Sequence, residues 1–221
     1  MPLRLALFDL DHTLLTGDSD VLWCDFLIAR GLLDRDTFSA RNCDMETRYK
    51  AGTVGVREFS EFYVGTLTGH APASLDTLRR DFLAQEIVPR IPAAAHALVK
   101  QHLGANDLVV MTTATNRFIT ELTAAHFNIE HLLATEPEIV DGRFTGRTQG
   151  TLNMREGKVK RLHAWLDARG QSLADFASTA YSDSINDLPL LLAVNVPIVV
   201  DPDAKLAAWA ASNGHRVIRL R

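Results

Sequence analysis

A short apolar run that ends in an aspartate, near the start of the chain, constrains the fold most. The stretch from Arg4 to Phe8 is mostly apolar, is too short for a helix, and is followed directly by Asp9. A run of this kind predicts a buried strand. In an open α/β sheet, a carboxylate at the C-terminal end of a strand lies in the crevice where ligands bind. The run therefore predicts an α/β fold with Asp9 at its ligand-binding edge.

A second acidic residue, Asp11, stands two positions after Asp9. If the backbone stays extended, both side chains lie on one face of the strand. Two carboxylates that close together raise each other's pKa or require a cation, and Mg²⁺ is a hard divalent ion that binds carboxylate oxygens. The alternative is a strand-to-loop turn in which the aspartates only cap backbone groups, because Asp is common in turns.

Length and composition are those of a globular enzyme. The chain has 221 residues, of which 47% are hydrophobic and 23% are charged, so it can bury a core and hold either one large domain or a core with an insertion. The net charge of −4 gives no basic face for nucleic acid.

Cys24 and Cys43 lack disulfide or zinc spacing, and we expect both to be reduced and in or near the core.

The sequence also bears on localisation. The few residues before Asp9 are too short for a signal peptide, and no apolar run approaches the roughly 18 residues of a membrane-spanning helix. We therefore expect a cytoplasmic protein without a membrane partner.

The region between residues 16 and 88 has the periodicity of helices rather than strands. Phe59 and Phe62, for example, belong to an apolar stripe with helical spacing, which is typical of a helical core. The pattern predicts four helices, over residues 21–28, 36–50, 56–67 and 73–87. Four consecutive helices after a strand-terminating aspartate predict an inserted all-helical cap over residues 16–88, with the core at 1–15 and 89–221.

After residue 89 the pattern alternates between strands and helices. Strands are predicted over residues 108–111, 129–140, 143–150, 177–181, 196–200 and 216–220. Helices are predicted over residues 93–102, 117–126, 188–193 and 204–212, together with one that begins near Lys158. This alternation is typical of a Rossmann-like, doubly wound α/β fold with a mostly parallel sheet.

Polar residues follow the predicted strand over 108–111. Thr112–Asn116 is a polar cluster that we expect to open the next helix, where hydroxyls and free backbone N–H groups form an anion site. The alternative is that Thr113 or Thr115 only caps that helix. Lys158 lies near a helix start, where a cation opposes the helix dipole. A lysine at such an unfavourable position indicates a functional residue. The alternative is an exposed lysine that is only solvated.

Carboxylates also follow the predicted strand over 177–181. In a doubly wound sheet the C-terminal ends of the strands meet at one edge. The groups that we expect to converge there are Asp9, Asp11, Thr113, Lys158, Asp183 and Asp187. A carboxylate nucleophile, a metal, a hydroxyl, an ammonium and a second acid are the parts that phosphoryl transfer through an aspartyl-phosphate requires.

These residues resemble the motifs of the haloacid dehalogenase superfamily of phosphatases. The similar subgroup is the one that resembles phosphoserine phosphatase and carries a helical cap between the first two motifs. Asp9–Thr13 matches the Asp-x-Asp-x-Thr first motif, Thr113 the second-motif hydroxyl, Lys158 the third-motif lysine and Asp183–Asp187 the acidic fourth motif. The resemblance covers essentially the whole chain, with the four motifs in the family's order.

The resemblance implies a role for each acid. Asp9 is then the nucleophile, and Asp11 is the general acid that protonates the leaving alkoxide and later activates water. Mg²⁺ is then held by Asp9, by the backbone carbonyl of Asp11 and by Asp183. A phosphoryl group in transfer spreads negative charge over its oxygens and needs cations and donors around it, which agrees with these roles.

The resemblance likewise implies that Thr113 and Lys158 bind the phosphoryl oxygens, while Asn186 and Asp187 support the metal and the lysine.

The fourth motif departs from the family's pattern, and the second motif offers two candidate hydroxyls. Ser182 and Ser184 flank Asp183 where the family often has Gly-Asp-Gly, so the acid is retained in a less permissive loop. Thr113 is preferred over Thr112 as the second-motif hydroxyl because Ala114 follows it and matches the small residue of the family.

Residues of the predicted cap bear on the substrate. Phosphoserine phosphatases bind their substrate with an acid nine residues after the nucleophile, where this chain has Asp18, and with a cap Arg, whose position falls near Glu61. An acid there repels a carboxylate, which favours an amino-alcohol phosphate such as histidinol phosphate, slightly ahead of phosphoserine. Asp20 adds a further acid. Alternatively, Asp18 and Asp20 only cap the first helix of the cap.

The cation that binds a substrate carboxylate could also come from elsewhere in the cap, since Arg48 or Arg57 could supply it. The prediction is a Mg²⁺-dependent phosphomonoesterase acting on a small phosphorylated metabolite, a phosphorylated amine, with no nucleic-acid partner. One alternative is a phosphotransferase or mutase with the same chemistry. Another is a non-catalytic regulatory protein that keeps the fold, although the intact acids and Lys158 argue against it.

Overall fold

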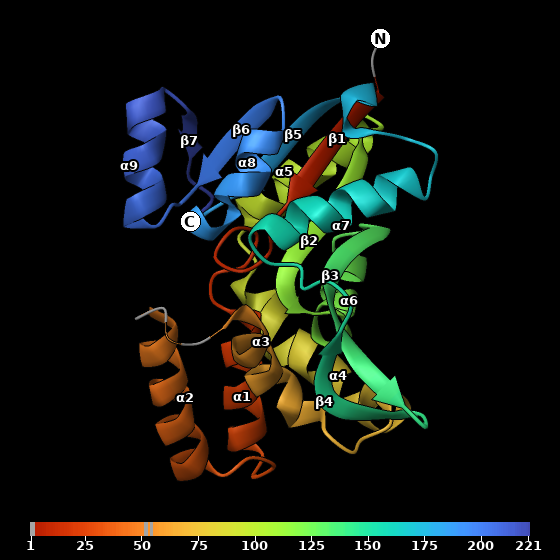
Figure 1. Ribbon diagram of the computed structural model, residues 1–221, viewed down its shortest axis with the longest axis vertical. Coiled ribbons are helices and arrows are strands. Elements are labelled where there is room, and N and C mark those ends of the chain that lie inside the picture. Colours follow the sequence, from red (N-terminus) through yellow and green to blue (C-terminus); the bar gives the residue numbers. More distant parts are fainter. Residues whose placement is uncertain (1–2, 51–52, 54) are drawn as a thin grey trace.

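One sheet with β1 at its centre organises the molecule. The computed structural model describes residues 3–50, 53 and 55–221, and in this part of the chain seven strands form one sheet in the order β4-β3-β2-β1-β5-β6-β7 (Figure 1). The strands are β1 (Leu3–Phe8), β2 (Leu108–Asn116), β3 (His131–Val140), β4 (Arg143–Gln149), β5 (Phe176–Ser182), β6 (Val196–Val200) and β7 (Arg216–Ile218). Neighbouring strands run parallel except for the antiparallel pair of β3 and β4.

The central strand β1 is apolar because both of its faces are covered. Ala6 and Phe8 belong to one hydrophobic cluster and Leu5 and Leu7 to a second, as the alternation of side chains along a strand requires. β1 pairs in parallel with β2 on one side and β5 on the other. The predicted buried strand is therefore confirmed, and Asp9 stands directly after its C-terminal end.

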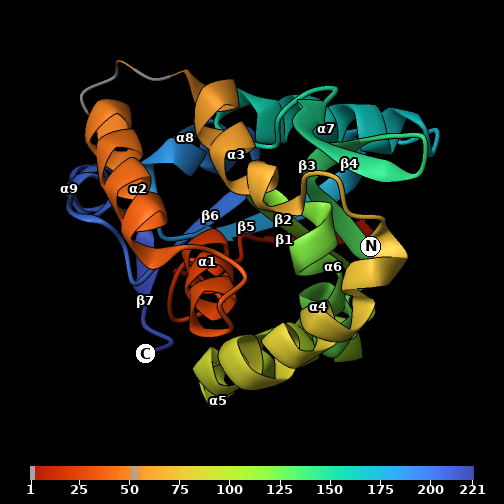
Figure 2. The ribbon, with the colours of Figure 1, turned by 90° about the horizontal axis from the view of Figure 1, so that it is seen from below.

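Helices cover both faces of the sheet, which confirms the doubly wound α/β fold. The helices after β1 and its helical insertion are α5 (Ala93–Gly104), α6 (Arg117–His126), α7 (Glu156–Asp167), α8 (Leu188–Ala193) and α9 (Ala204–Asn213). On one face α7, α8 and α9 pack through Leu162, Leu190 and Leu206. On the other face α5 and α6 pack through Ala95 and Ile119. Figure 2 shows α7 and α8 on one side of the strands and α5 and α6 on the other.

All regular elements in the described part of the segment between β1 and α5 are helical. The α-helices are α1 (Ser19–Ala29), α2 (Arg35–Lys50), α3 (Val56–Val64) and α4 (Asp76–Phe82), with shorter 3₁₀ turns at Gly65–Leu67, Pro72–Leu75 and Val88–Arg90 and a π turn at Leu83–Ile87. In Figure 1 these helices lie below the sheet, next to the β3–β4 hairpin. The predicted helix over 73–87 is thus divided, and the turn that follows it contains Pro89, which lacks a backbone donor.

The helical segment shares its apolar core with one face of the sheet. Trp23, Leu67 and Phe82 belong to the same cluster of buried side chains as Phe8 and Leu10. The rings of Trp23 and Phe82 meet edge to face with their centroids 5.2 Å apart. Core packing is therefore continuous from the sheet into the helices.

Strand β2 is longer than predicted. It runs through Asn116, so the polar cluster at Thr112–Asn116 lies in a strand, and its last residue, Asn116, opens the helix that starts at Arg117 as predicted. Asn116 caps α6, because its side-chain oxygen accepts a hydrogen bond from the backbone N–H of Ile119 at 3.3 Å. The alternative that Thr113 or Thr115 caps this helix is therefore wrong.

The two cysteines differ in environment. Cys24 is buried, as predicted, but Cys43 is exposed on α2, so its predicted place in or near the core is wrong. A helix long and apolar enough to span a bilayer is absent from the described ranges.

Candidate active site

A buried ion-pair network lies at the C-terminal end of β1. The ammonium nitrogen of Lys158 is 2.6 Å from Oδ1 of Asp9 and 2.6 Å from Oδ2 of Asp187. Lys158 lies in the first turn of α7 and is only 2% exposed. The alternative of a solvated surface lysine is therefore wrong, because this ammonium is buried between two carboxylates.

Burial and charge act against each other on these groups. Burial alone would lower the pKa of Lys158, but the charges of Asp187 and Asp9 outweigh burial and raise its pKa. Burial raises the pKa of Asp9 to about 7, although the nearby Lys158 ammonium lowers it. The single ammonium therefore carries less positive charge than the carboxylates around it can carry negative charge.

Thr13 connects Asp9 with Asp183, which follows β5. The hydroxyl oxygen of Thr13 is 3.0 Å from Oδ2 of Asp9 and 2.9 Å from Oδ1 of Asp183, and it accepts the backbone N–H of Asp183 at 3.0 Å. A hydroxyl has one proton, so it can donate to only one of the two carboxylates at a time. Burial and the charge of Asp9 raise the pKa of Asp183 to about 8.

The chemistry of this donor set fits a divalent cation. Asp9 and Asp183 are buried, bridged by one hydroxyl and mutually repelling, and a cation between them would keep both ionised. Within the described residues, no group of three or more His, Cys, Asp or Glu side chains is arranged to hold a metal. Two carboxylates suffice for Mg²⁺, which usually keeps several waters and binds one or two carboxylates.

Asp11 lies on the side of the site that faces α1. Its Oδ1 accepts the backbone N–H of Ser19 at 2.7 Å, and its Oδ2 lies 2.9 Å from the hydroxyl of Thr115 and 3.4 Å from that of Thr113. Burial and the charge of Asp18 raise its pKa to about 6, against the effect of the hydrogen bonds from Ser19 and Thr115.

Thr112 and Thr113 point in different directions from β2. The hydroxyl of Thr113 is directed at Asp11, whereas that of Thr112 accepts a hydrogen bond from the Asn153 amide at 2.9 Å. Of the two, Thr113 is therefore the threonine beside Asp11, but it is fully buried, and the cavity lining from β2 consists of Ala114 and Thr115.

The loop after β5 supports Lys158. The hydroxyl of Ser182 donates to Oδ2 of Asp187 at 2.8 Å, and the same hydroxyl accepts the backbone N–H of Ser184 at 3.2 Å. The side-chain oxygen of Asn186 accepts from Nε of Arg155 at 3.2 Å. The serine that replaces the family's glycine thus holds the aspartate that pairs with Lys158.

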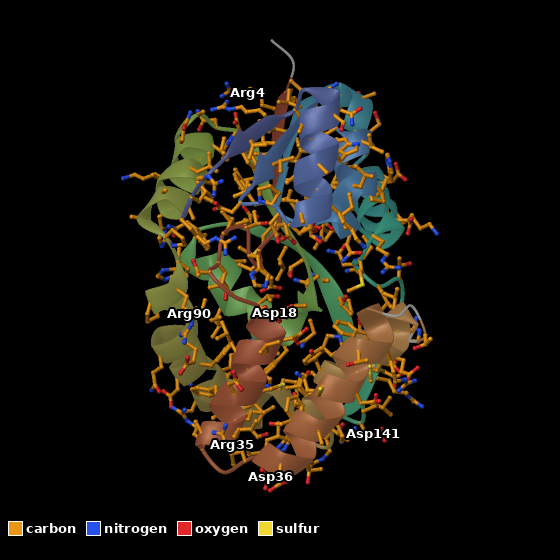
Figure 3. The ribbon with its side chains drawn as sticks, turned by 90° about the vertical axis from the view of Figure 1, so that its left-hand side faces the viewer. Arg4, Asp18, Arg35, Asp36, Arg90 and Asp141 are labelled. Atoms are coloured by element: carbon orange, nitrogen blue, oxygen red, sulfur yellow. The ribbon has the colours of Figure 1, made fainter. Side chains whose placement is uncertain are left out.

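A cavity of about 160 Å³ opens onto these groups. The core residues that line it include Asp9, Asp11, His12, Ala114, Thr115, Met154, Lys158, Asp183, Ser184, Asn186 and Asp187. The helical segment contributes Asp18, Asp20, Phe59 and Ser60. Figure 3 shows Asp18 at the end of α1 that faces the sheet.

Asp18 and Asp20 differ in how they are held. Asp18 lines the cavity and also caps α1, because its side chain accepts the backbone N–H of Val21 at 3.0 Å. Asp20 has one oxygen 3.3 Å from the hydroxyl of Thr115, while its buried Oδ1 has no hydrogen-bond partner in the described structure. Burial and the charges of Asp18 and Asp11 raise the pKa of Asp20.

Glu61 lies away from the cavity. Its Oε1 accepts the backbone N–H and the hydroxyl of Thr148 on β4, both at 3.0 Å. Arg57 donates to the carbonyls of Thr148 and Gly150, and Arg48 pairs with Glu58 at 2.9 Å. The prediction that Glu61 repels a substrate carboxylate is thus wrong, and neither arginine is a cavity-lining residue.

Thr13, Thr115 and Asn153 contact this site although none of them is among the predicted catalytic, binding or metal-binding residues. Thr13 has a signal in the sequence, because it completes the Asp-x-Asp-x-Thr motif. Thr115 is also detectable, because it stands two positions after Thr113 and so shares its face of β2. Asn153 has no local signal, since its contacts with Thr112, Thr113 and Leu133 exist only in the folded chain.

The sequence and the fold are similar to those of known proteins. A histidinol-phosphatase from Neisseria meningitidis serogroup C (strain 8013) is 37% identical to this chain over 220 residues, which cover 99% of each protein. A crystal structure of a protein of unknown function from Bordetella pertussis Tohama I is 45% identical, covers 100% of both chains and superposes with a TM-score of 0.96. A substrate-bound phosphoserine phosphatase is 15% identical, covers 94% of this chain and 90% of its own, and shares the fold with a TM-score of 0.67.

The family model described as haloacid dehalogenase-like hydrolase matches residues 6–192. This range contains Asp9, Thr113, Lys158 and Asp183, the residues on which the resemblance was based. The chain therefore belongs to the haloacid dehalogenase-like hydrolases.

Proposed function

We propose that this chain is a Mg²⁺-dependent phosphomonoesterase that acts through an aspartyl-phosphate on a small phosphorylated amine. The observation that carries the proposal is the buried Lys158 ammonium, held 2.6 Å from both Asp9 and Asp187 in a cavity that Asp18 and Asp20 also line. An ammonium beside the nucleophile balances the charge of a phosphoryl group. Acids on the cap side suit a substrate ammonium.

The first step forms the covalent intermediate. An oxygen of Asp9 attacks the phosphorus, the ester P–O bond breaks, and Asp11 donates its carboxyl proton to the leaving alkoxide. Asp11 is suited to this role because the Ser19 N–H and the Thr115 hydroxyl hold its two oxygens in the cavity wall. Asp9 starts from a defined orientation because Lys158 and Thr13 bind its two oxygens.

The second step releases phosphate. A water molecule attacks the phosphorus of the aspartyl-phosphate, the ionised Asp11 takes the proton of that water, and the P–O bond to Asp9 breaks. Asp9 returns to a free carboxylate and Asp11 to a carboxylic acid, so the site is ready for another cycle.

Thr113 and Lys158 bind the phosphoryl oxygens in this proposal. Asp187 keeps Lys158 directed at the site, and the Ser182 hydroxyl that donates to Asp187 supports it. Asn186 lines the cavity beside Asp187 and is held by Arg155.

Asp9, Asp183 and the backbone carbonyl of Asp11 would hold Mg²⁺. A bound Mg²⁺ supplies positive charge against the phosphoryl oxygens and orients the ester. The buried and mutually repelling carboxylates of Asp9 and Asp183 support this assignment.

The cap over residues 16–88 is proposed to select the substrate, and the core at 1–15 and 89–221 to carry the chemistry. The cap contributes Asp18, Asp20 and the ring of Phe59 to the cavity. This lining suits a positively charged group attached to a small, partly apolar body.

The proposed substrate class is an amino-alcohol phosphate without a carboxylate, such as histidinol phosphate. Among the described residues that line the cavity, Lys158 is the one lysine or arginine, and it is paired with two acids. A substrate carboxylate therefore lacks a cationic partner on the cap side. The similarity to a histidinol-phosphatase supports the same substrate.

The test is phosphate release from histidinol phosphate and phosphoserine in parallel, with Mg²⁺ or with EDTA, for the wild type and Asp9→Asn. We expect faster turnover of histidinol phosphate, loss of activity with EDTA, and a loss in the variant of about 10³-fold or more. Faster turnover of phosphoserine would overturn the substrate assignment. Activity that survives in Asp9→Asn would overturn the mechanism.

A further inference from the structure

The buried residue Asn153 joins two segments that carry the proposed phosphate-binding groups. It is 0% exposed, and its amide nitrogen lies 2.9 Å from the hydroxyl oxygen of Thr112, 2.9 Å from the carbonyl oxygen of Thr113 and 2.8 Å from the carbonyl oxygen of Leu133. Backbone carbonyls only accept hydrogen bonds, so the NH₂ group of Asn153 must face them. One side chain thereby connects β2, β3 and the loop before α7.

The same loop is packed closely against the start of α7. The backbone N–H of Asn153 donates to the hydroxyl of Thr135 at 3.2 Å. A Cβ atom on Gly157 would collide with the carbonyl of Leu152, so the loop touches the turn of helix that carries Lys158. Asn153 and the helical turn that carries Lys158 therefore lie in one tightly packed segment.

We propose that Asn153 is a positioning residue that sets the separation between Thr113 and Lys158, the two groups that bind the phosphoryl oxygens. This inference rests on the proposed function. Asn153 binds the carbonyl of Thr113 directly and reaches Lys158 through the loop. Its hydrogen bonds go to β2 and β3, whereas Asp9 and Asp183 follow β1 and β5. Asn153 therefore acts on phosphate binding and leaves the proposed metal-binding acids in place.

The variant Asn153→Asp tests this role because it keeps the shape of the side chain and replaces an NH₂ group with two donors by an oxygen that carries at most one. The probe is inorganic phosphate, and its Kd is measured by titration calorimetry in the presence of Mg²⁺. We expect the Kd to rise about 10- to 100-fold, the size of effect typical of residues that orient a binding group. The Mg²⁺ concentration for half-maximal phosphatase activity should stay within about threefold, because distant sites act independently.

Asn116→Asp is the matched control. Asn116 is also buried in β2, but its side-chain oxygen accepts the Ile119 N–H and its amide nitrogen has no partner in the described structure. An aspartate there keeps the helix cap. We expect the phosphate Kd of Asn116→Asp to stay within about twofold of wild type.

Thr112→Val provides a milder variant in case Asn153→Asp does not fold. It removes one of the three acceptors of the Asn153 amide and keeps the volume of the side chain. We expect a weaker effect in the same direction, a phosphate Kd about two- to fivefold above wild type.

Each other outcome overturns the inference. A lower Tm with an unchanged phosphate Kd would make Asn153 merely structural. Equal weakening of phosphate and Mg²⁺ would indicate a general distortion of the site. A wild type that neither binds phosphate nor hydrolyses any phosphate ester would overturn the proposed function as well, whereas an active wild type with an unchanged phosphate Kd in the variants overturns this inference alone.

Discussion

The acids of the cavity differ in the partners that hold them, and this difference separates their roles. Asp9 is held by an ammonium and a hydroxyl, and Asp11 by a backbone N–H and a hydroxyl. Within the described part of the chain, Asp20 has a 3.3 Å contact with Thr115, and its other oxygen is buried without a hydrogen-bond partner. A buried oxygen without a donor is costly. Asp20 is therefore the acid with most to gain from a cationic substrate.

Asp20→Asn should reduce the preference for cationic substrates. The substitution removes a group that can ionise beside a cationic substrate and keeps an oxygen for the Thr115 hydroxyl. A hydrogen bond to a charged group is worth about 1.5–3 kcal/mol, so kcat/KM for histidinol phosphate should fall by about 10- to 100-fold. For p-nitrophenyl phosphate, whose leaving group carries no cation, it should change by less than about threefold. Steady-state kinetics with both esters makes the comparison, and an equal loss with both would mean that Asp20 only holds Thr115 and Asp11.

Residues of the site differ in how far the sequence can predict them. Asp9, Asp11 and Thr13 lie within one short segment, so local spacing nearly determines their arrangement. Glu61 lies on a helix, where the direction of a side chain depends on how the whole helix is rotated. In the structure α3 turns Glu61 toward Thr148 on β4, and no local pattern could reveal that contact.

At the scale of elements, β2 and α7 depend on contacts with other parts of the chain. The polar run at Thr112–Asn116 has the composition of a loop, yet Thr112 and Asn116 pair with β3 and the whole run lies in a strand. Hydrogen bonds from Asn153 to Thr112 and Thr113 satisfy polar groups that a buried strand would otherwise leave unpaired. Local preference is overridden here by partners distant in the sequence.

Gly157→Ala should destabilise the protein although Ala is the better helix former. An added Cβ would meet the carbonyl of Leu152 and force the loop away from α7. We expect a loss of about 1–3 kcal/mol in the free energy of unfolding, typical of overpacking, together with a lower kcat/KM. Urea unfolding and phosphatase assays measure both effects.

Gly104→Ala is the matched control for this prediction. Gly104 is the last residue of α5, and a Cβ there meets nothing within 4 Å. The same substitution should be neutral or stabilise by up to about 1 kcal/mol. If Gly157→Ala behaved like Gly104→Ala, the close packing of the loop on α7 would be contradicted.

For the whole molecule, the shared core makes the helical segment and the sheet depend on each other. Trp23, Leu67 and Phe82 pack in one cluster with Phe8 and Leu10. The alternation of strands and helices predicts the doubly wound sheet, because strands such as β1 and β6 bury apolar runs between helical segments. This continuity of the core was not predictable, since an amphipathic helix does not specify which surface covers its apolar face.

Mg²⁺ should stabilise the folded protein as a ligand. At a Mg²⁺ concentration 100-fold above its Kd, binding to the folded state alone adds about 2.7 kcal/mol. For a chain of this size that corresponds to a rise in Tm of about 5–10 °C over the EDTA-treated protein. Differential scanning calorimetry at several Mg²⁺ concentrations checks the shift, with Asp183→Asn as the control. A shift that persists in the variant would place the Mg²⁺ elsewhere.

The central position of β1 has a consequence for biosynthesis. Leu5 pairs with Leu108 on one side, and Leu3 pairs with Phe176 on the other. Synthesis proceeds at about 5–20 residues per second, so the ribosome needs about 5–20 s after β1 before the first of these partners exists. During that interval an apolar strand with two open edges leaves the exit tunnel without a sheet to join. The nascent chain is therefore expected to expose this apolar segment at this stage, long before Lys158 is made and can pair with Asp9.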